Sequence, residues 1–379
     1  MSPARSTLRA CLLLLAAAWP CAQAASPPPW PPIRHVFVLL LENQSEAETF
    51  GHSSRAPYLA RTLPAQGARL PQYYGIGHAS LGNYVALISG QAPNHETQLD
   101  CAVFSEFRPT AASVDAHGQL AGLGCVYPAV VRTLPDQLEE AGFSWRAYME
   151  DMGNNRAREP ATCAHVAVGT ADNTEEAQIG DQYAARHNPF VYFHSIIDDQ
   201  KRCDHHVVNL ALLPQDLKSA ATTPNYVFIT PNLCNDGHDA PCVDGRPGGL
   251  REIDAFLRRW VPLITQSPAF RADGLLVITF DESDHGGSEG VAACCGERPL
   301  PGAKYPPGIS GPGGGRVGAV LLSPFVRPGT VSRERYNHYS LLGTVESIFG
   351  LPPLGYAAEP DLRLIGRDVF NDTAPRSSR

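Results

Sequence analysis

The feature that most constrains the fold is a series of short, continuously apolar runs separated by helix-like segments. The runs occupy residues 35–41, 226–230, 275–280 and 317–322. Unbroken apolarity of this length predicts strands that are buried on both faces. Residues 248–267 carry their apolar side chains on one face, as an amphipathic helix does. This alternation predicts an α/β fold, with a mostly parallel central sheet flanked by helices on both faces.

Other segments fit the same pattern. Residues 84–90 are apolar enough to begin a helix, and 131–142 read as a helix that a glycine ends. We expect a further strand at 143–148 and a late helix at 338–349. No internal repeat is visible along the chain.

Polar side chains follow three of the apolar runs. They are Glu42 and Asn43 after the first run, Asp236 and His238 shortly after the second, and Asp281 and Glu282 after the third. The carboxyl ends of parallel strands meet at one edge of a sheet, where ligands bind. Oxygen donors with at most an imidazole are the ligands that hard divalent cations take. The sequence therefore predicts a divalent metal site at this edge.

Ser80 is the candidate nucleophile. It lies in a turn of small residues just before the expected helix, and a helix N-terminus favours a bound anion. A serine hydroxyl beside a divalent metal loses its proton more readily, because the metal lowers the pKa of the oxygen. Asn83 lies one turn further on, where we expect its amide to hydrogen-bond a phosphate oxygen.

Longer stretches carry a family resemblance. They are HVFVLLLENQSEAETFG at 35–51, APYL at 56–59, HASLGNYVALISG at 78–90, TPNLCNDGHD at 230–239, TFDES at 279–283 and the segment 317–352. Together they resemble the bacterial and fungal acid phosphatases and phospholipases C, a family of the alkaline-phosphatase superfamily. The resemblance covers nearly the whole chain after the N-terminal segment, and the combination of motifs carries it rather than any one of them.

The resemblance implies the site residues. A divalent metal would be bound by Glu42, Asn43, Asp281 and Glu282, with Ser80 completing its shell. A second cation would be held by Asp236, His238 and His338, or these residues with His78 would protonate the leaving group and stabilise the phosphoryl group. Asp284 and His285 are an alternative to Asp281 and Glu282, but they lie further from the strand end.

Two departures from the family pattern concern the loops. Ala79 and Gly82 stand where prolines are common in the family, and Ser45-Glu46-Ala47 replaces the usual residues after Asn43. Neither change removes a predicted ligand, but both bear on the rigidity of these loops. The Gly-rich, cysteine-bearing segment 283–315 is expected to be an elaboration that shapes the substrate cleft.

Charge excludes some partners. The formal net charge is −8, and the basic residues form no patch or tail. Nucleic acid is therefore not expected as a partner, because its phosphates require a basic surface. An anionic substrate must be held locally, by a metal or by a few arginines.

The N-terminus has the pattern of an export signal. Arg5 and Arg9 precede a short apolar run, and residues 22–24 fit the small-x-small rule for cleavage. The run is too short to span a membrane, so no stable membrane insertion is expected. A lipid anchor at Cys21 is the alternative. We expect a signal peptide at 1–24, a Pro-rich exposed spacer at 25–33 and a single phosphoesterase domain at 34–379, exported to the periplasm or the medium.

Cysteine content agrees with export. Ten cysteines less Cys11 and Cys21 leave an even number, which favours disulfides in an oxidising compartment. We expect Cys101 to pair with Cys125 and Cys163 with Cys203, in a chain whose insertions at about 101–125 and 283–315 carry disulfides. The other bridges would come from Cys234, Cys242, Cys294 and Cys295. A zinc cluster is the alternative, but the chain has no C-x-x-C pair.

The expected function follows from the site and the resemblance. Ser80 would attack a phosphate ester, form a phosphoserine and be released by water, with His78 or His238 as acid and base. A phosphomonoester is the expected substrate, phosphorylated lipids and nucleotides included. A phospholipase C-like diesterase is the alternative within the fold, and an inactive exported binding or adhesion module is the alternative of another class. Metal identity and number and oligomeric state stay open.

Overall fold

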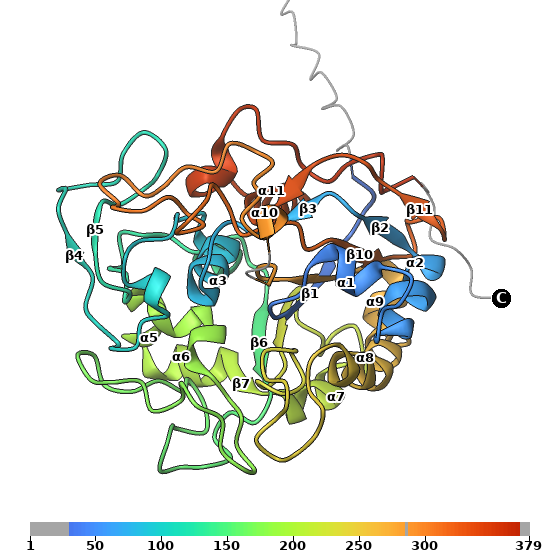
Figure 1. Ribbon diagram of the computed structural model, residues 1–379, viewed down its shortest axis with the longest axis horizontal. Coiled ribbons are helices and arrows are strands. Elements are labelled where there is room, and N and C mark those ends of the chain that lie inside the picture. Colours follow the sequence, from blue (N-terminus) through green and yellow to red (C-terminus); the bar gives the residue numbers. More distant parts are fainter. Residues whose placement is uncertain (1–29, 285–286, 372–379) are drawn as a thin grey trace, which may run out of the picture.

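The computed structural model describes residues 30–284 and 287–371 (Figure 1). The predicted signal peptide, residues 25–29 of the spacer and His285 lie outside the described residues. The end of the spacer is anchored rather than exposed: Ile33 is 4% exposed, and Trp30 Nε1 donates a 2.9 Å hydrogen bond to Ser347 Oγ. Within the described ranges, no helix combines the length and apolarity needed to cross a membrane.

An eight-stranded sheet forms the centre of the molecule, with the order β11-β2-β10-β9-β1-β8-β6-β7. Its strands are β1 (His35–Leu41), β2 (Ala68–Leu70), β6 (Trp145–Met149), β7 (Val207–Asn209), β8 (Tyr226–Thr230), β9 (Gly274–Phe280), β10 (Ala319–Leu322) and β11 (Thr330–Val331). Strand β10 pairs antiparallel with β9 and β2, and the other pairings are parallel. Two short ribbons join β3 (Tyr73–Tyr74) to β12 (Tyr336–Asn337) and β4 (Arg108–Pro109) to β5 (Gly122–Leu123). The predicted mostly parallel α/β sheet is confirmed.

The three strands with polar ends are direct neighbours. Strand β1 pairs in parallel with β8 on one side and with β9 on the other, and all three are buried along their whole length. Their carboxyl ends therefore lie at one edge, as the sequence pattern predicted. The strands β2, β7 and β11 were not predicted, because two or three residues are too few to show a periodic pattern.

Helices cover both faces of the sheet (Figure 1). They include α3 (Ser80–Ser89), α4 (Leu134–Glu140), α8 (Leu250–Thr265), α9 (Pro268–Asp273) and α11 (His338–Phe349). The others are α1 (Glu46–Phe50), α2 (Leu63–Gln66), α5 (His194–Ile197), α6 (Gln200–His206), α7 (Leu213–Asp216) and α10 (Gly287–Gly290). Helices α3, α4 and α11 pack together, whereas α8 packs with α9. The predicted helix at 338–349 matches α11, which the Asn337 side chain caps at Ser340 N.

Two of the disulfides are the expected pairs, and the structure assigns the two that the sequence left open. The disulfides join Cys101 to Cys125, Cys163 to Cys203, Cys234 to Cys242 and Cys294 to Cys295. The last pair joins adjacent residues inside the segment 283–315.

Candidate active site

Ser80 is the first residue of α3, and Glu42 is the first residue after β1. The Ser80 hydroxyl donates a 2.8 Å hydrogen bond to Glu42 Oε2. Tyr84, one turn along α3, donates a 2.6 Å bond to the other oxygen, Oε1. Ser80 is 3% exposed and Glu42 is 0% exposed. The helix therefore holds both oxygens of one buried carboxylate from residues at positions i and i+4, which share a helix face.

Asn43 and Asp281 bring the ends of β1 and β9 together. The Asn43 backbone N–H donates to Asp281 Oδ1 at 3.1 Å, and Asn43 has a φ of 55°, in the left-handed region. Asparagine tolerates this conformation better than most residues. Asp281 Oδ2 is buried and makes no hydrogen bond within the described residues. This side of the site has a carboxylate oxygen in need of a positive partner.

Glu282 points to His78. Its Oε2 lies 2.6 Å from His78 Nδ1, and His78 Nε2 lies 2.7 Å from the carbonyl oxygen of Gly290. Both side chains are almost fully buried. A carbonyl can only accept, so His78 carries a proton on Nε2. His78 is thus tied to the segment that follows β9 and has little freedom to meet a leaving group.

His187 is a site residue that the sequence analysis missed. Its Nε2 lies 3.3 Å from Glu42 Oε1, and its Nδ1 lies 3.1 Å from Asp236 Oδ2. The ring stacks on Tyr84 at 5.3 Å between centroids. Burial lowers the pKa of His187 well below its usual value, which keeps the ring neutral. The residue follows no apolar run, so the rule that finds polar residues at strand ends could not find it.

Asp236 and His238 lie together as predicted. Asp236 Oδ1 accepts from the His238 backbone N–H at 2.8 Å, and Asp236 is fully buried. The His238 side chain is 31% exposed, with Nδ1 2.8 Å from Asp239 Oδ1. His238 is therefore the histidine of this group with the most access to a bound substrate.

His338 does not join Asp236 and His238 in a second cation site. Its Nε2 lies 2.5 Å from the carbonyl oxygen of Asp281, and its Nδ1 lies 3.0 Å from the Tyr73 hydroxyl. Both ring nitrogens are thus engaged, and both Asp236 oxygens are engaged by His187 and the His238 backbone. Burial lowers the pKa of His338 to about 4, so the ring is neutral. The structure makes His338 a support for the Asp281 backbone.

The Asn83 side chain has different hydrogen-bond partners from the phosphate oxygen that was expected. Its Oδ1 accepts from the backbone N–H groups of Ile76 and Gly77, at 2.8 and 3.0 Å. Its Nδ2 donates to the carbonyl oxygens of Gly77 and Ala79, at 2.9 and 3.2 Å. These four bonds use the side chain's capacity, so Asn83 fixes the loop before Ser80 instead of facing phosphate. The same four bonds hold the loop before Ser80 rigid, although Ala79 and Gly82 stand where the family commonly has prolines.

Like charges accumulate at this edge of the sheet. Burial, and then the charges of Asp281 and Asp236, raise the pKa of Glu42 well above its usual value. Burial also raises the pKa of Asp281 to about 7 and that of Glu282 well above its usual value. Buried carboxylates at close range are unfavourable without a cation. A divalent ion would relieve this repulsion.

The donor set fits such an ion. Glu42, Asn43, Ser80 and Asp281 offer oxygen ligands from three neighbouring segments, and Asp281 Oδ2 lacks a partner. Among the described residues, the tight groups of three or more acidic, histidine or cysteine ligands are Cys234, Cys242 and Asp244, and Cys294, Cys295 and Glu297. Their cysteines are in disulfides, so neither group is a metal site. At Glu42 and Asp281, the hydroxyl of Ser80 and the side-chain oxygen of Asn43 would complete such a donor set.

Comparison with known proteins agrees with this geometry. The model of the Phosphoesterase family matches residues 56–352. The chain is 27% identical over 327 residues to a phosphatidylinositol-3-phosphatase of Mycobacterium tuberculosis, a match that covers 86% of this chain and 80% of that protein.

Two further similarities are more partial. A phosphate-repressible acid phosphatase of Penicillium chrysogenum is 26% identical, over 77% of this chain and 54% of that longer protein. The chain thus spans about half the length of that fungal relative. Among solved structures, a protein of the alkaline phosphatase superfamily from Vibrio parahaemolyticus aligns with a TM-score of 0.48 and 12% identity, covering 90% of this chain and 73% of that one.

Proposed function

This chain belongs to the Phosphoesterase family and hydrolyses phosphoric ester bonds, and from that premise we propose that it is an exported, metal-dependent phosphomonoesterase with Ser80 as its nucleophile. The observation that carries the proposal is the hydrogen bond from the Ser80 hydroxyl to Glu42, within a group of buried carboxyls. A serine used only for packing or capping has no need of such surroundings.

Glu42, Asn43, Ser80 and Asp281 would hold the cation, with Glu282 close behind them. When bound, the ion would lower the pKa of the serine hydroxyl and neutralise charge on the phosphate. Glu42 Oε2 accepts the hydrogen bond of the Ser80 hydroxyl, and the hydrogen bond from Tyr84 to the other oxygen keeps that carboxylate in place.

The reaction proceeds in two displacements. Ser80 Oγ passes its proton to Glu42 Oε2 and forms a bond to phosphorus while the bond from phosphorus to the leaving oxygen breaks, and the leaving oxygen takes up a proton from the general acid. Water then attacks the phosphoserine, the bond from Oγ to phosphorus breaks, and Ser80 regains its proton. His238 is the proton donor and acceptor that the geometry favours, because its ring is partly exposed whereas His78 and His187 are buried.

Export is supported by the sequence pattern at the N-terminus and by the disulfides. A phosphomonoester is the preferred substrate class because several proteins similar to this chain are named phosphatases. Which alcohol the substrate carries is left to experiment.

The test is a pair of assays on the oxidised protein from Ala25 onward. A nitrophenyl phosphomonoester and the matching diester are offered across acid to alkaline pH, before and after treatment with a chelator. We expect monoester cleavage that the chelator abolishes and added divalent metal restores. Preference for the diester would move the chain to phospholipase C-like chemistry, and inactivity on both with metal restored would favour the binding module.

A further inference from the structure

A buried arginine borders the candidate site and has no role in the chemistry described above. Arg186 is 6% exposed and immediately precedes His187. Its Nη1 donates a 2.9 Å hydrogen bond to the carbonyl oxygen of Glu175. Its Nη2 lies 3.3 Å from His238 Nε2. Arginine donates only, so His238 Nε2 is the acceptor in this contact.

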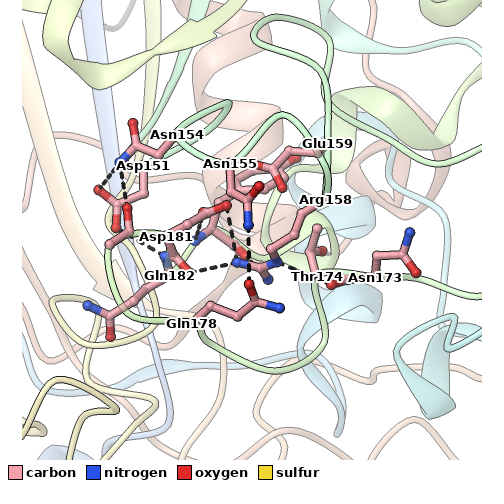
Figure 2. Close-up of polar contacts among 12 residues, drawn as sticks. Asp151, Asn154, Asn155, Arg158, Glu159, Asn173, Thr174, Gln178, Asp181 and Gln182 are labelled. Carbon is pink, nitrogen blue, oxygen red and sulfur yellow. Dashed lines mark hydrogen bonds and ion pairs between the residues drawn. The ribbon is translucent and has the colours of Figure 1, made fainter.

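The loop that fixes Arg186 is organised by a second buried arginine (Figure 2). The Arg158 guanidinium donates to the backbone carbonyl oxygens of Asn173, Glu176, Asp181 and Tyr183. Its Nη1 also lies 3.3 Å from a carboxylate oxygen of Asp181. This network holds the segment 173–183, which includes the carbonyl of Glu175. Arg186 is therefore held in one orientation before any substrate binds.

Thr174 connects this loop to the short helical turn η3 (Ala185–His187). The Thr174 hydroxyl accepts a 2.7 Å hydrogen bond from the backbone N–H of Ala185. Asp172 in turn accepts from both the backbone and the hydroxyl of Thr174. The backbone next to Arg186 is thus tied to the loop through Thr174, which Asp172 holds in place.

Arg186 is also within electrostatic reach of the serine end of α3. Asp100 Oδ1 accepts a 2.9 Å hydrogen bond from the backbone N–H of Leu81, the residue after Ser80. Burial raises the pKa of Asp100, and the positive charge of Arg186 lowers it again. Burial also raises the pKa of Asp236, and the positive charge of Arg186 acts to lower it. The turn η3, which carries Arg186, packs against α3, and Arg186 Nη2 contacts His238, so Arg186 borders both α3 and the loop of His238.

We propose that Arg186 is a phosphate-binding residue that determines specificity for dianionic phosphomonoesters. A non-bridging phosphate oxygen would replace His238 Nε2 as the acceptor of Arg186 Nη2. This inference rests on the proposed function and names the substrate charge that the same site selects.

The selection follows from the charge and shape of the two ester classes. A phosphomonoester near neutral pH has three non-bridging oxygens and a charge between about −1.5 and −2. A phosphodiester has two such oxygens and a single negative charge. A guanidinium binds phosphate strongly through charge-assisted bonds in a planar, often bidentate geometry. A fixed guanidinium at the third oxygen therefore favours the monoester.

The experiment compares Arg186→Gln, Arg186→Lys and the control Arg246→Gln in the metal-loaded protein. Arg246 lies on the loop after His238 and contacts Asp244, Asn235 and Glu252, so its loss perturbs the same region without removing a group that faces His238. For each variant, kcat/KM is measured for the nitrophenyl monoester and diester, and the affinity for inorganic phosphate is measured by calorimetry.

We expect Arg186→Gln to lower monoester kcat/KM by about 100-fold, the usual cost of one preorganised donor to the reacting group. Diester kcat/KM should fall less than about 10-fold, and phosphate affinity should fall at least about 10-fold. Arg186→Lys should fall in between, and Arg246→Gln should leave the ratio of the two activities unchanged. Equal losses for both esters in Arg186→Gln, or unaltered phosphate affinity, would overturn the inference.

The calorimetric measurement separates this inference from the proposed function. If the wild-type protein cleaves neither ester, the proposed function fails, and phosphate binding by wild type and Arg186→Gln still decides the role of Arg186. Binding that depends on Arg186 would support a phosphate site, whereas binding that ignores it would contradict one.

Discussion

The Ser80 hydroxyl donates a 2.8 Å hydrogen bond to Oε2 of Glu42, although 38 residues separate the two in sequence. The contact joins the start of α3 to the end of β1. Because Tyr84 holds the other oxygen of Glu42 from the next turn of α3, one helix orients both the nucleophile and the carboxylate it faces. The sequence pattern predicted both residues as parts of the site, and their contact connects the two predictions.

Tyr84→Phe tests how far this arrangement depends on the second contact. The substitution removes a 2.6 Å hydrogen bond to a fully buried carboxylate and leaves the ring that stacks on His187. We expect kcat to fall about 10-fold or more and KM to change little, because a misplaced carboxylate affects the reacting serine more than binding. Steady-state kinetics on the monoester measure this. A change confined to KM would contradict it.

Asn83→Ala tests the assignment of Asn83 to the loop. Four backbone groups lose their partner, so we expect the free energy of unfolding to fall by about 2–4 kcal/mol. Denaturant unfolding measures it. Asn154→Ala, at an exposed site where the amide makes two 3.1 Å bonds, serves as the control and should cost less than about 1 kcal/mol. Wild-type stability with a large loss of kcat would instead favour direct contact of Asn83 with phosphate.

The burial of Glu346 predicts how the free energy of unfolding depends on pH. The residue is 1% exposed, and burial raises its pKa to about 9. The folded state therefore keeps a proton that the unfolded state releases above its own pKa, near 4.3. The contribution of Glu346 to the free energy of unfolding is therefore fully present below about pH 4 and is lost as the pH rises toward about 9.

Glu346→Gln should remove that loss. The glutamine keeps an acceptor for the Leu354 backbone N–H, which Glu346 Oε1 binds at 2.9 Å, and it cannot ionise. We expect the variant to be more stable than wild type by at least about 1 kcal/mol at pH 8 and no more stable at pH 4. Thermal unfolding at the two pH values measures the difference. The same stability difference at both values would be evidence against a titrating Glu346.

The sequence predicted the residues that follow strands and missed those that do not. Glu42, Asn43, Asp281 and Glu282 stand directly after apolar runs, and parallel pairing of β9, β1 and β8 brings those runs side by side. The positions of His187 and Arg186 depend on the fold of the segment 151–183, which lacks long apolar runs. No local pattern marks them.

Side-chain partners were harder to predict than positions. Asn83 and His338 lie near the site as expected, but their polar atoms bind backbone groups of Gly77 and Asp281. Which group an amide or imidazole meets is decided by tertiary packing, since several partners are chemically equivalent. The contacts of His338 with Tyr73 and Asp281 give no support to the second cation site predicted at Asp236, His238 and His338, which stays a prediction.

The most direct test of the central claim is detection of phosphate on Ser80. The metal-loaded protein is mixed with the monoester, quenched in acid during turnover, digested and analysed by mass spectrometry, with Ser80→Ala as the control. We predict one added phosphoryl group on Ser80 in the wild-type protein, none in Ser80→Ala, and loss of at least about 1,000-fold in kcat in that variant. Turnover that persists near the wild-type rate in Ser80→Ala, or a phosphoryl group on another residue, would contradict the claim.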